Sequence, residues 1–98
     1  MSVIGTFADV ATEDVWNGRD TRAARTIPKA VWRVVQRKLD LLNRATRLDA
    51  LRVPPGNRLE ALRGKRAGSY SIRVNDQYRI TFTFREEAFY EVCCEDYH

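Results

Sequence analysis

The sequence predicts a single α+β domain, residues 1–98, in which two N-terminal helices pack on one face of a small antiparallel sheet. Two observations lead to this prediction. Apolar residues recur at helical spacing in the first half of the chain, whereas the second half alternates apolar and polar residues as half-buried strands do. Between the halves, Pro54-Pro55-Gly56 ends the helical pattern. A chain of 98 residues can build one hydrophobic core.

The first elements are expected to be a short strand and a short helix. Residues 3–7 can form the strand. Thr12 with two acidic residues behind it predicts the start of the helix, and Asn17-Gly18 predicts its end. The segment that follows, residues 19–25, is basic.

A longer helix is expected next. Thr26 as a cap and Pro28 in the first turn predict its start. The residues expected on its buried side are Val31, Val34, Val35, Leu39, Leu41, Leu42 and Ala45. The residues expected on its solvent side are Arg33, Arg37, Lys38 and Arg44.

The second half is expected to supply the sheet. Leu48, Leu51 and Val53 form a short apolar turn before the break. Residues 58–62 show a weak alternation of apolar and polar residues and can form a short strand. Residues 63–68 read as a flexible basic loop. The strands expected after it are 70–74, 78–84 and 89–95, with a polar connection at 85–88 before the last one.

The first two of these strands form a ribbon whose register the pattern selects. Its apolar residues are Tyr70, Ile72, Val74, Tyr78, Ile80, Phe82 and Phe84. A two-residue loop would turn the apolar side of the second strand outward. A three-residue loop, Asn75-Asp76-Gln77, instead pairs Val74 with Tyr78 and Ile72 with Ile80. The longer loop is therefore predicted.

In that register Arg73 lies opposite Arg79 on the face away from the core, and such a like-charge pair costs stability unless an anion lies between the two. Two interpretations stay open. The last strand, with Tyr90, Val92 and Cys94 inward, places Glu91 and Glu95 on the arginine face, where they can pair with the arginines. Alternatively, the two guanidinium groups bind phosphate oxygens.

Composition narrows the possible functions. The net charge of +4 favours an anionic partner, and no apolar run is long enough to span a bilayer, so a cytoplasmic protein is expected. Cys93 and Cys94 are adjacent in a strand and point to opposite faces, with no second pair to build a disulfide framework or a zinc site. We find no glycine-rich phosphate motif and no catalytic serine or cysteine arrangement, so no cofactor or metal is expected.

The stretch from Pro54 to Phe82 and the ending Asp96-Tyr97-His98 closely resemble the HigB-type toxins of bacterial toxin-antitoxin pairs, within the RelE/ParE superfamily. Phe7, Thr12-Glu13, Trp16-Asn17-Gly18 and Arg37-Lys38-Leu39 extend this resemblance over essentially the whole chain. The chain departs from the usual pattern at Glu86-Glu87 and at Cys93-Cys94, where altered packing is expected more than altered chemistry.

The resemblance implies a RelE-like fold and an endoribonuclease that cuts messenger RNA, usually in the ribosomal A site. It also implies a helix-turn-helix antitoxin of the HigA type that neutralises the toxin, with operator DNA bound only through their complex. The site residues carried over by matched position are Arg73, Arg79, Asp96, Tyr97 and His98.

RNA cleavage without a metal requires deprotonation of the 2′-hydroxyl, stabilisation of the phosphoryl oxygens and a proton for the leaving 5′-oxygen. Arg73 and Arg79 suit the phosphoryl oxygens, and His98 suits proton transfer because its ordinary pKa of about 6.5 lies near working pH. Tyr97 shares the arginine face and can stack on a base or touch the phosphate, and Asp96 can orient a neighbour. Lys65 and Arg66 are expected to bind the RNA or ribosomal backbone.

Two alternatives remain at this stage. Members of the superfamily related to ParE inhibit DNA gyrase by binding, and a non-toxic homologue would bind only antitoxin and operator DNA. A histidine beside paired arginines favours the nuclease, because an inhibitor that acts by binding does not need a group for proton transfer.

Overall fold

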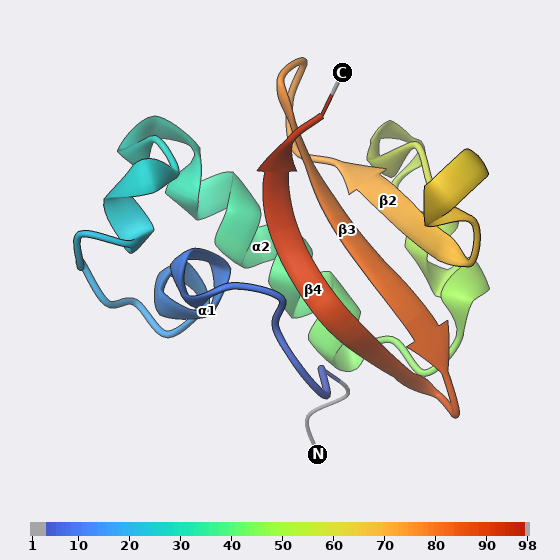
Figure 1. The fold of residues 1–98 in the computed structure, drawn as a ribbon. Helices are drawn as coiled ribbons and strands as arrows, with labels where there is room; N and C mark the ends of the chain where they lie inside the picture. Colours follow the sequence, from blue (N-terminus) through green and yellow to red (C-terminus); the bar gives the residue numbers. More distant parts are fainter. Residues whose placement is uncertain (1–3, 98) are drawn as a thin grey trace.

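A four-stranded antiparallel sheet forms the second half of the molecule, and helices cover one of its faces (Figure 1). The computed structural model describes residues 4–97. Its strands are β1 (Glu60–Ala61), β2 (Ser69–Arg73), β3 (Tyr78–Arg85) and β4 (Ala88–Asp96). They are hydrogen-bonded in the order β1-β2-β3-β4, each antiparallel to its neighbour. The predicted α+β class and antiparallel sheet are confirmed.

The helical layer consists of one main helix and one short helix, so the prediction of two packed helices is confirmed only in part. Helix α2 (Trp32–Arg44) crosses behind the sheet, and α1 (Val10–Trp16) lies beside it near β4 (Figure 1). Short 3₁₀ turns connect these elements; they span Ala24–Thr26, Lys29–Val31, Leu48–Arg52, Pro55–Asn57 and Gly64–Arg66. Among the described residues, no helix combines the length and apolar character needed to cross a bilayer.

Helix α1 begins earlier than predicted. Its N-cap is Asp9, whose side chain accepts a hydrogen bond of 2.9 Å from the Thr12 amide. Thr12, expected to start the helix, is fully buried inside it. Its Oγ1 accepts a 2.9 Å hydrogen bond from the Cys94 amide and so attaches α1 to β4.

Helix α2 begins later than predicted, at Trp32. Thr26 does not cap it, because the Thr26 hydroxyl donates to the carbonyl of Ala23 at 2.6 Å. Pro28 has an extended ψ of 131°, which is incompatible with continuous helix. The Trp32 indole donates to the Ile27 carbonyl at 2.7 Å, and this bond fixes the start of the helix.

The ribbon of β2 and β3 has the predicted register. Ile72 pairs with Ile80, and Arg73 pairs with Arg79. The Val74 amide donates to the Tyr78 carbonyl at 3.0 Å and closes the three-residue loop. Asn75 stabilises this loop, because its Oδ1 accepts hydrogen bonds from the amides of the last loop residue and of Tyr78, at 2.9 and 2.7 Å. Local turn chemistry thus supports the hydrophobic pattern.

Strand β4 contains a bulge that the sequence pattern did not predict. Thr81 pairs with Cys93, but Thr83 pairs with Tyr90, so β4 has one residue more than β3 in this stretch. Glu91 lies within this bulge and has a left-handed backbone conformation, with a φ of 53°. Phe89 therefore packs in the core in place of Tyr90, and the prediction that Tyr90 points inward is wrong. Val92 and Cys94 are buried as predicted, while Cys93 is half-buried on the other face.

The first described residues run parallel to β4 but do not form a continuous strand. Ile4 bridges to Phe89, and Phe7 bridges to Val92. The strand expected at residues 3–7 is therefore reduced to two isolated bridges, and residue 3 lies outside the described residues. Gly5 lies so close to the Tyr90 ring that an added Cβ would come within 2.4 Å of it.

Candidate functional site

The face of the sheet away from the helices is polar. By register, it holds Ser71, Arg73, Arg79, Thr81, Thr83, Cys93 and Glu95. Arg73 pairs with Arg79, which pairs in turn with Glu95, so three charged residues form one row across β2, β3 and β4. Glu60 of β1 pairs with Ser71 and lies on the same face. The predicted placement of both arginines on one face is confirmed.

Arg79 is held firmly. Its Nε donates to the Ser71 hydroxyl at 2.8 Å, and its Nη2 donates to the Arg58 carbonyl at 2.7 Å. Nη2 also lies 3.7 Å from Oε1 of Glu60, and only 12% of the side chain is exposed. Nη1 has no hydrogen-bond partner within residues 4–97. A fixed guanidinium with an open donor edge suits an anion.

Arg73 lies at the end of β2 with 33% of its side chain exposed. Its Nη2 contacts the carboxylate of Asp76, a loop residue whose side chain is almost entirely exposed. No ion pair links Glu91 or Glu95 to either arginine of the row in the part of the chain that the structure describes. The interpretation in which those glutamates neutralise the arginine pair is therefore not supported.

Glu95 pairs instead with Arg66. Two hydrogen bonds of 2.8 and 2.9 Å join the guanidinium to the carboxylate, and the Thr81 hydroxyl donates a third at 2.6 Å. These bonds, led by those from Arg66, lower the pKa of Glu95, and the same carboxylate raises the pKa of Arg66. Arg66 belongs to the 3₁₀ turn Gly64–Arg66, so the segment expected to be a flexible loop contains a defined turn.

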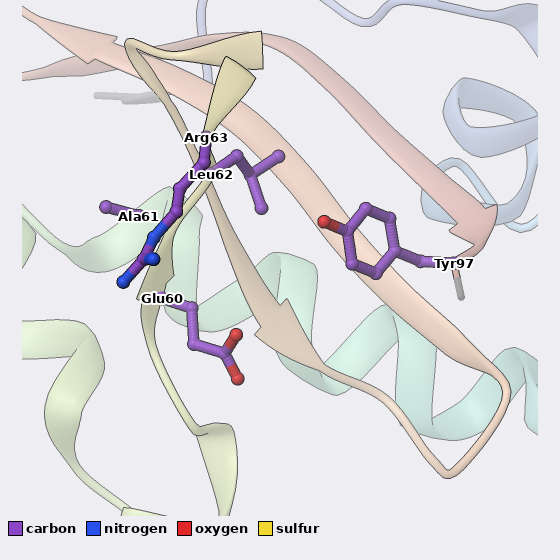
Figure 2. A pocket seen from close by; sticks show the side chains of 5 residues that line it. All are labelled: Glu60, Ala61, Leu62, Arg63 and Tyr97. Atoms are coloured by element: carbon purple, nitrogen blue, oxygen red, sulfur yellow. The ribbon is translucent and has the colours of Figure 1, made fainter. Parts of the chain in front are cut away.

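Tyr97 stands next to this pair and borders a pocket. The centre of its ring is 5.9 Å from Cζ of Arg66, and its amide donates to the Gln77 carbonyl at 3.1 Å. A pocket of about 570 Å³ lies between Tyr97 and β1. Its lining residues are Glu60, Ala61, Leu62, Arg63 and Tyr97 (Figure 2). In Figure 2 the Tyr97 hydroxyl and the Glu60 carboxylate extend toward the space between β1 and the end of β4.

The remaining predicted site residues are not all on this face. Asp96 pairs with Tyr78 and therefore points to the opposite side of the sheet, where its Oδ2 accepts a 3.0 Å hydrogen bond from Gln77. Lys65 is exposed on the turn that carries Arg66. His98 lies outside the described residues. Within those residues, no three His, Cys, Asp or Glu side chains are grouped as metal ligands.

Residues 6–98 match the HigB-like toxin family, described as RelE-like toxins of the type II toxin-antitoxin system HigB. This chain belongs to the HigB-like toxin family.

Two relatives are consistent with this membership, and one solved structure has a similar fold. The chain is 46% identical over 63 residues to Toxin HigB-1 of Vibrio cholerae serotype O1, covering 64% of this chain and 66% of that protein. It is 43% identical over 58 residues to an uncharacterized protein of Haemophilus influenzae, covering 59% and 57%. The chain thus spans less than two thirds of each relative's length. The YoeB-YefM complex from Staphylococcus aureus matches with a TM-score of 0.61 at 16% identity, over 97% of both chains, which shows similarity of fold.

Lys38 of this HigB-like chain is buried, contrary to the prediction that it faces solvent. Only 8% of it is exposed, and its Nζ donates to Oδ1 of the fully buried Asn57. Burial lowers the pKa of Lys38, and the positive charges of Arg37 and Arg73 lower it further. The side-chain Nδ2 of Asn57 donates to the backbone carbonyls of Leu51 and Val53 at 3.1 and 3.3 Å.

This buried contact lies directly beside the site of the HigB-like fold. Asn57 precedes Arg58, which has a φ of 46° and whose carbonyl accepts the bond from Arg79. Sequence reasoning missed Lys38, Asn57, Arg58 and Glu60. The left-handed backbone conformation of Arg58 and the register of the two-residue strand β1 leave no recognisable pattern in the sequence. Ser71 lies two residues before Arg73 in the same strand, so the two side chains share a face. This spacing could have identified Ser71 as a site residue.

Replacement of Asn57 by alanine is expected to lower the free energy of unfolding by about 2–4 kcal/mol, because a buried ammonium loses its acceptor and two carbonyls lose their donors. Urea unfolding measures this change. The double variant Lys38→Met/Asn57→Ala should lose less than the sum of the single variants, since it leaves no buried charge behind. Additive losses would contradict the coupling.

Replacement of Glu95 by glutamine is expected to lower the free energy of unfolding by about 0.2–1 kcal/mol at neutral pH, since solvent screens the partly exposed pair. The folded-state pKa of Glu95 lies below its ordinary value of 4.5, so the unfolded chain takes up the proton first as the pH falls. The stabilisation is therefore complete above pH 4.5 and disappears as the pH drops through the lowered folded value. Denaturant unfolding across this range should show the two proteins converging in acid. Asp49→Asn, which alters the two ion pairs that exposed Asp49 forms with exposed Arg47 and Arg52, serves as the control.

Proposed function

We propose that this chain is the toxin of a type II toxin-antitoxin pair and that it acts as a metal-independent endoribonuclease on messenger RNA at the ribosome. A helix-turn-helix antitoxin of the HigA type neutralises it, and operator DNA is bound only through their complex. The observation that supports this most directly is the pairing of Arg73 with Arg79 on the open face of the sheet. No carboxylate of the described residues contacts both guanidinium groups.

The arginine pair supplies what a cleavage site needs first, which is fixed positive charge. Arg79 is held by Ser71 and by the Arg58 carbonyl, so it requires little reorganisation when negative charge develops on a bound phosphate. Arg73 has a solvated partner, Asp76, that a phosphate can replace at low cost. We assign both guanidinium groups to the phosphoryl oxygens, where they stabilise the transition state.

The chemical step follows from the proton balance. The 2′-oxygen loses its proton and bonds to the adjacent phosphorus, the bond from phosphorus to the 5′-oxygen breaks, and that oxygen takes up a proton. The products are a 2′,3′-cyclic phosphate and a 5′-hydroxyl. We assign His98 to the proton transfers. Tyr97 reaches the same face and stacks on a base or contacts the phosphate.

The other residues receive supporting roles. Asp96 faces the opposite side of the sheet and bonds to Gln77, whose carbonyl in turn accepts from the Tyr97 amide, so we assign it to positioning the end of β4. Lys65 and Arg66 bind the RNA or ribosomal backbone. Arg66 is already paired with Glu95, so Lys65 is expected to contribute the larger share of salt-sensitive affinity.

Arg73→Ala and His98→Ala should each abolish growth inhibition and reduce RNA cleavage by at least about 10²-fold, the scale of losing one transition-state donor. Primer extension on cellular messages after induction measures cleavage, and circular dichroism confirms folding. Arg52→Ala removes an arginine that pairs with Asp49 and should cut like the parent protein. A folded variant at either position with full toxicity would remove that residue from the site. An SOS response with intact messages would instead support a gyrase inhibitor.

Lys65→Ala should weaken binding of single-stranded RNA and reduce the slope of log K against log salt concentration by about 0.7, the share of one phosphate contact. Fluorescence anisotropy at several salt concentrations measures this slope, with His98→Ala in both proteins so that the RNA stays intact. Arg44→Ala, which removes an exposed arginine at the end of α2 that pairs with Asp40, should leave the slope unchanged. An unchanged slope for Lys65→Ala would place Lys65 away from the RNA.

A further inference from the structure

The end of the sheet opposite Tyr97 has a separate pocket that the cleavage mechanism does not use. Strands β3 and β4 meet there in their hairpin, at the end of the sheet away from the C-terminus (Figure 1). The volume of the pocket is about 580 Å³. Its lining residues are Thr6, Gly68, Thr83, Phe84, Arg85, Tyr90 and Glu91. It shares no described residue with the pocket at Tyr97.

The bulge in β4 places an aromatic ring beside this pocket. Thr83 lies on the polar face of the sheet and pairs with Tyr90, so the Tyr90 side chain is on that face too. Gly5 makes room for the ring, because a Cβ at that position would come within 2.4 Å of it. The extra residue in β4 and a glycine in the N-terminal segment together hold Tyr90 outside the core.

The guanidinium of Arg85 is stacked on this ring. Its Cζ lies 3.9 Å from the centre of the Tyr90 ring, which is van der Waals contact and a close cation–π distance. A stacked guanidinium uses its face and leaves its N–H groups, which lie in its plane, free to donate. Arg85 is exposed, and its side chain forms no hydrogen bond or ion pair within residues 4–97. The arginine is therefore held by the ring while its donors stay open to an anion.

One carboxylate, that of Glu91, borders the same pocket and opposes an anion there. It forms no ion pair with Arg85 in the part of the chain that the structure describes. Glu91 is exposed, so its side chain can turn into solvent at small cost. A solvated surface arginine would need neither a ring fixed beneath it nor an open pocket beside it, so anion binding explains the arrangement better.

Arg85 lies on the same face of the sheet as the arginine row. Arg79 and Arg85 both belong to β3, and side chains at alternate positions of a strand share a face. The rise of about 3.3 Å per residue puts them about 20 Å apart. The side chains between them on this face, Thr81 and Thr83, carry hydroxyl groups and no charge. At the spacing of about 3.4 Å per phosphate in stacked strands, an RNA spans this distance with about six nucleotides, and with fewer when it is extended.

We propose that Arg85, stacked on Tyr90, binds a backbone phosphate of the same RNA strand whose cleaved phosphate lies at Arg79. The bound phosphate is up to about six nucleotides away from the cleaved one. The inference rests on the proposed nuclease function and adds to it a contact at the far end of the sheet. This contact carries no base specificity, because a phosphate is the same at every nucleotide.

The test compares binding of short and long single-stranded RNA by proteins that carry His98→Ala, so that the RNA stays intact. The short RNA, of about four nucleotides, reaches only the arginine row, and the long ones add about six nucleotides at the 5′ end or at the 3′ end. Arg85→Ala should weaken binding of one long RNA about fivefold and lower its slope of log K against log salt concentration by about 0.7. The other extension and the short RNA should be unaffected, since the strand runs along β3 in one direction. Fluorescence anisotropy at several salt concentrations measures both quantities.

A second variant predicts a change of opposite sign. Glu91→Gln should strengthen binding of the same long RNA about twofold, because it removes a negative charge beside the pocket. Arg52→Ala, which removes an exposed arginine that pairs with Asp49, should bind every RNA as the parent protein does. Equal effects of Arg85→Ala on short and long RNA, or no effect on any of them, would overturn the contact at Arg85 and leave the nuclease proposal standing. A parent protein that cuts no RNA overturns both.

Discussion

The pairing of β2 with β3 is the constraint on which the candidate site depends. Side chains alternate between faces along a strand, so a slip of one residue would move one arginine of the row into the core. The loop of residues 75–77 prevents this slip, because Asn75 accepts two backbone hydrogen bonds inside it and Val74 closes it against Tyr78. Ile72 and Ile80, both fully buried, make any other register costly. The same interactions that form the core therefore determine that Arg73 and Arg79 lie opposite each other on one face.

A second layer of contacts holds Arg79 in place at some cost in stability. The Lys38 ammonium is buried without a carboxylate partner among the described residues, and this burial lowers its pKa. Its hydrogen bond fixes Asn57, and the next residue, Arg58, adopts a left-handed conformation that directs its carbonyl to Arg79. A buried polar network of this kind fixes geometry more than it adds stability. Such rigidity favours binding of an anion whose charge increases during a reaction.

The sequence predicted the parts of the molecule that local pattern determines. The alternation of apolar and polar residues is compatible with only one of the two loop lengths considered. Together they predicted the ribbon, its register and the common face of Arg73 and Arg79. Non-local contacts determined the parts that were predicted wrongly or missed. The bulge at Glu91 depends on the partner strand and moves Tyr90 out of the core, and the burial of Lys38 depends on Asn57 from another segment. A helical wheel of α2 places that lysine near Leu42, but it cannot supply the acceptor that makes burial tolerable.

Each of three arginines on the open face has a carboxylate nearby, yet the face still suits an anion. Asp76 contacts Arg73, Glu60 approaches Arg79, and Glu95 binds Arg66. The first two carboxylates are largely exposed and can turn into solvent at small cost, whereas Arg79 stays fixed. An approaching phosphate thus meets one fixed cation, Arg79, and two carboxylates that can move away. Glu95 differs, because two bonds from Arg66 and one from Thr81 hold it in place beside Arg79. Its charge is balanced by Arg66, so the fixed guanidinium of Arg79 remains the main anion-binding group of the row.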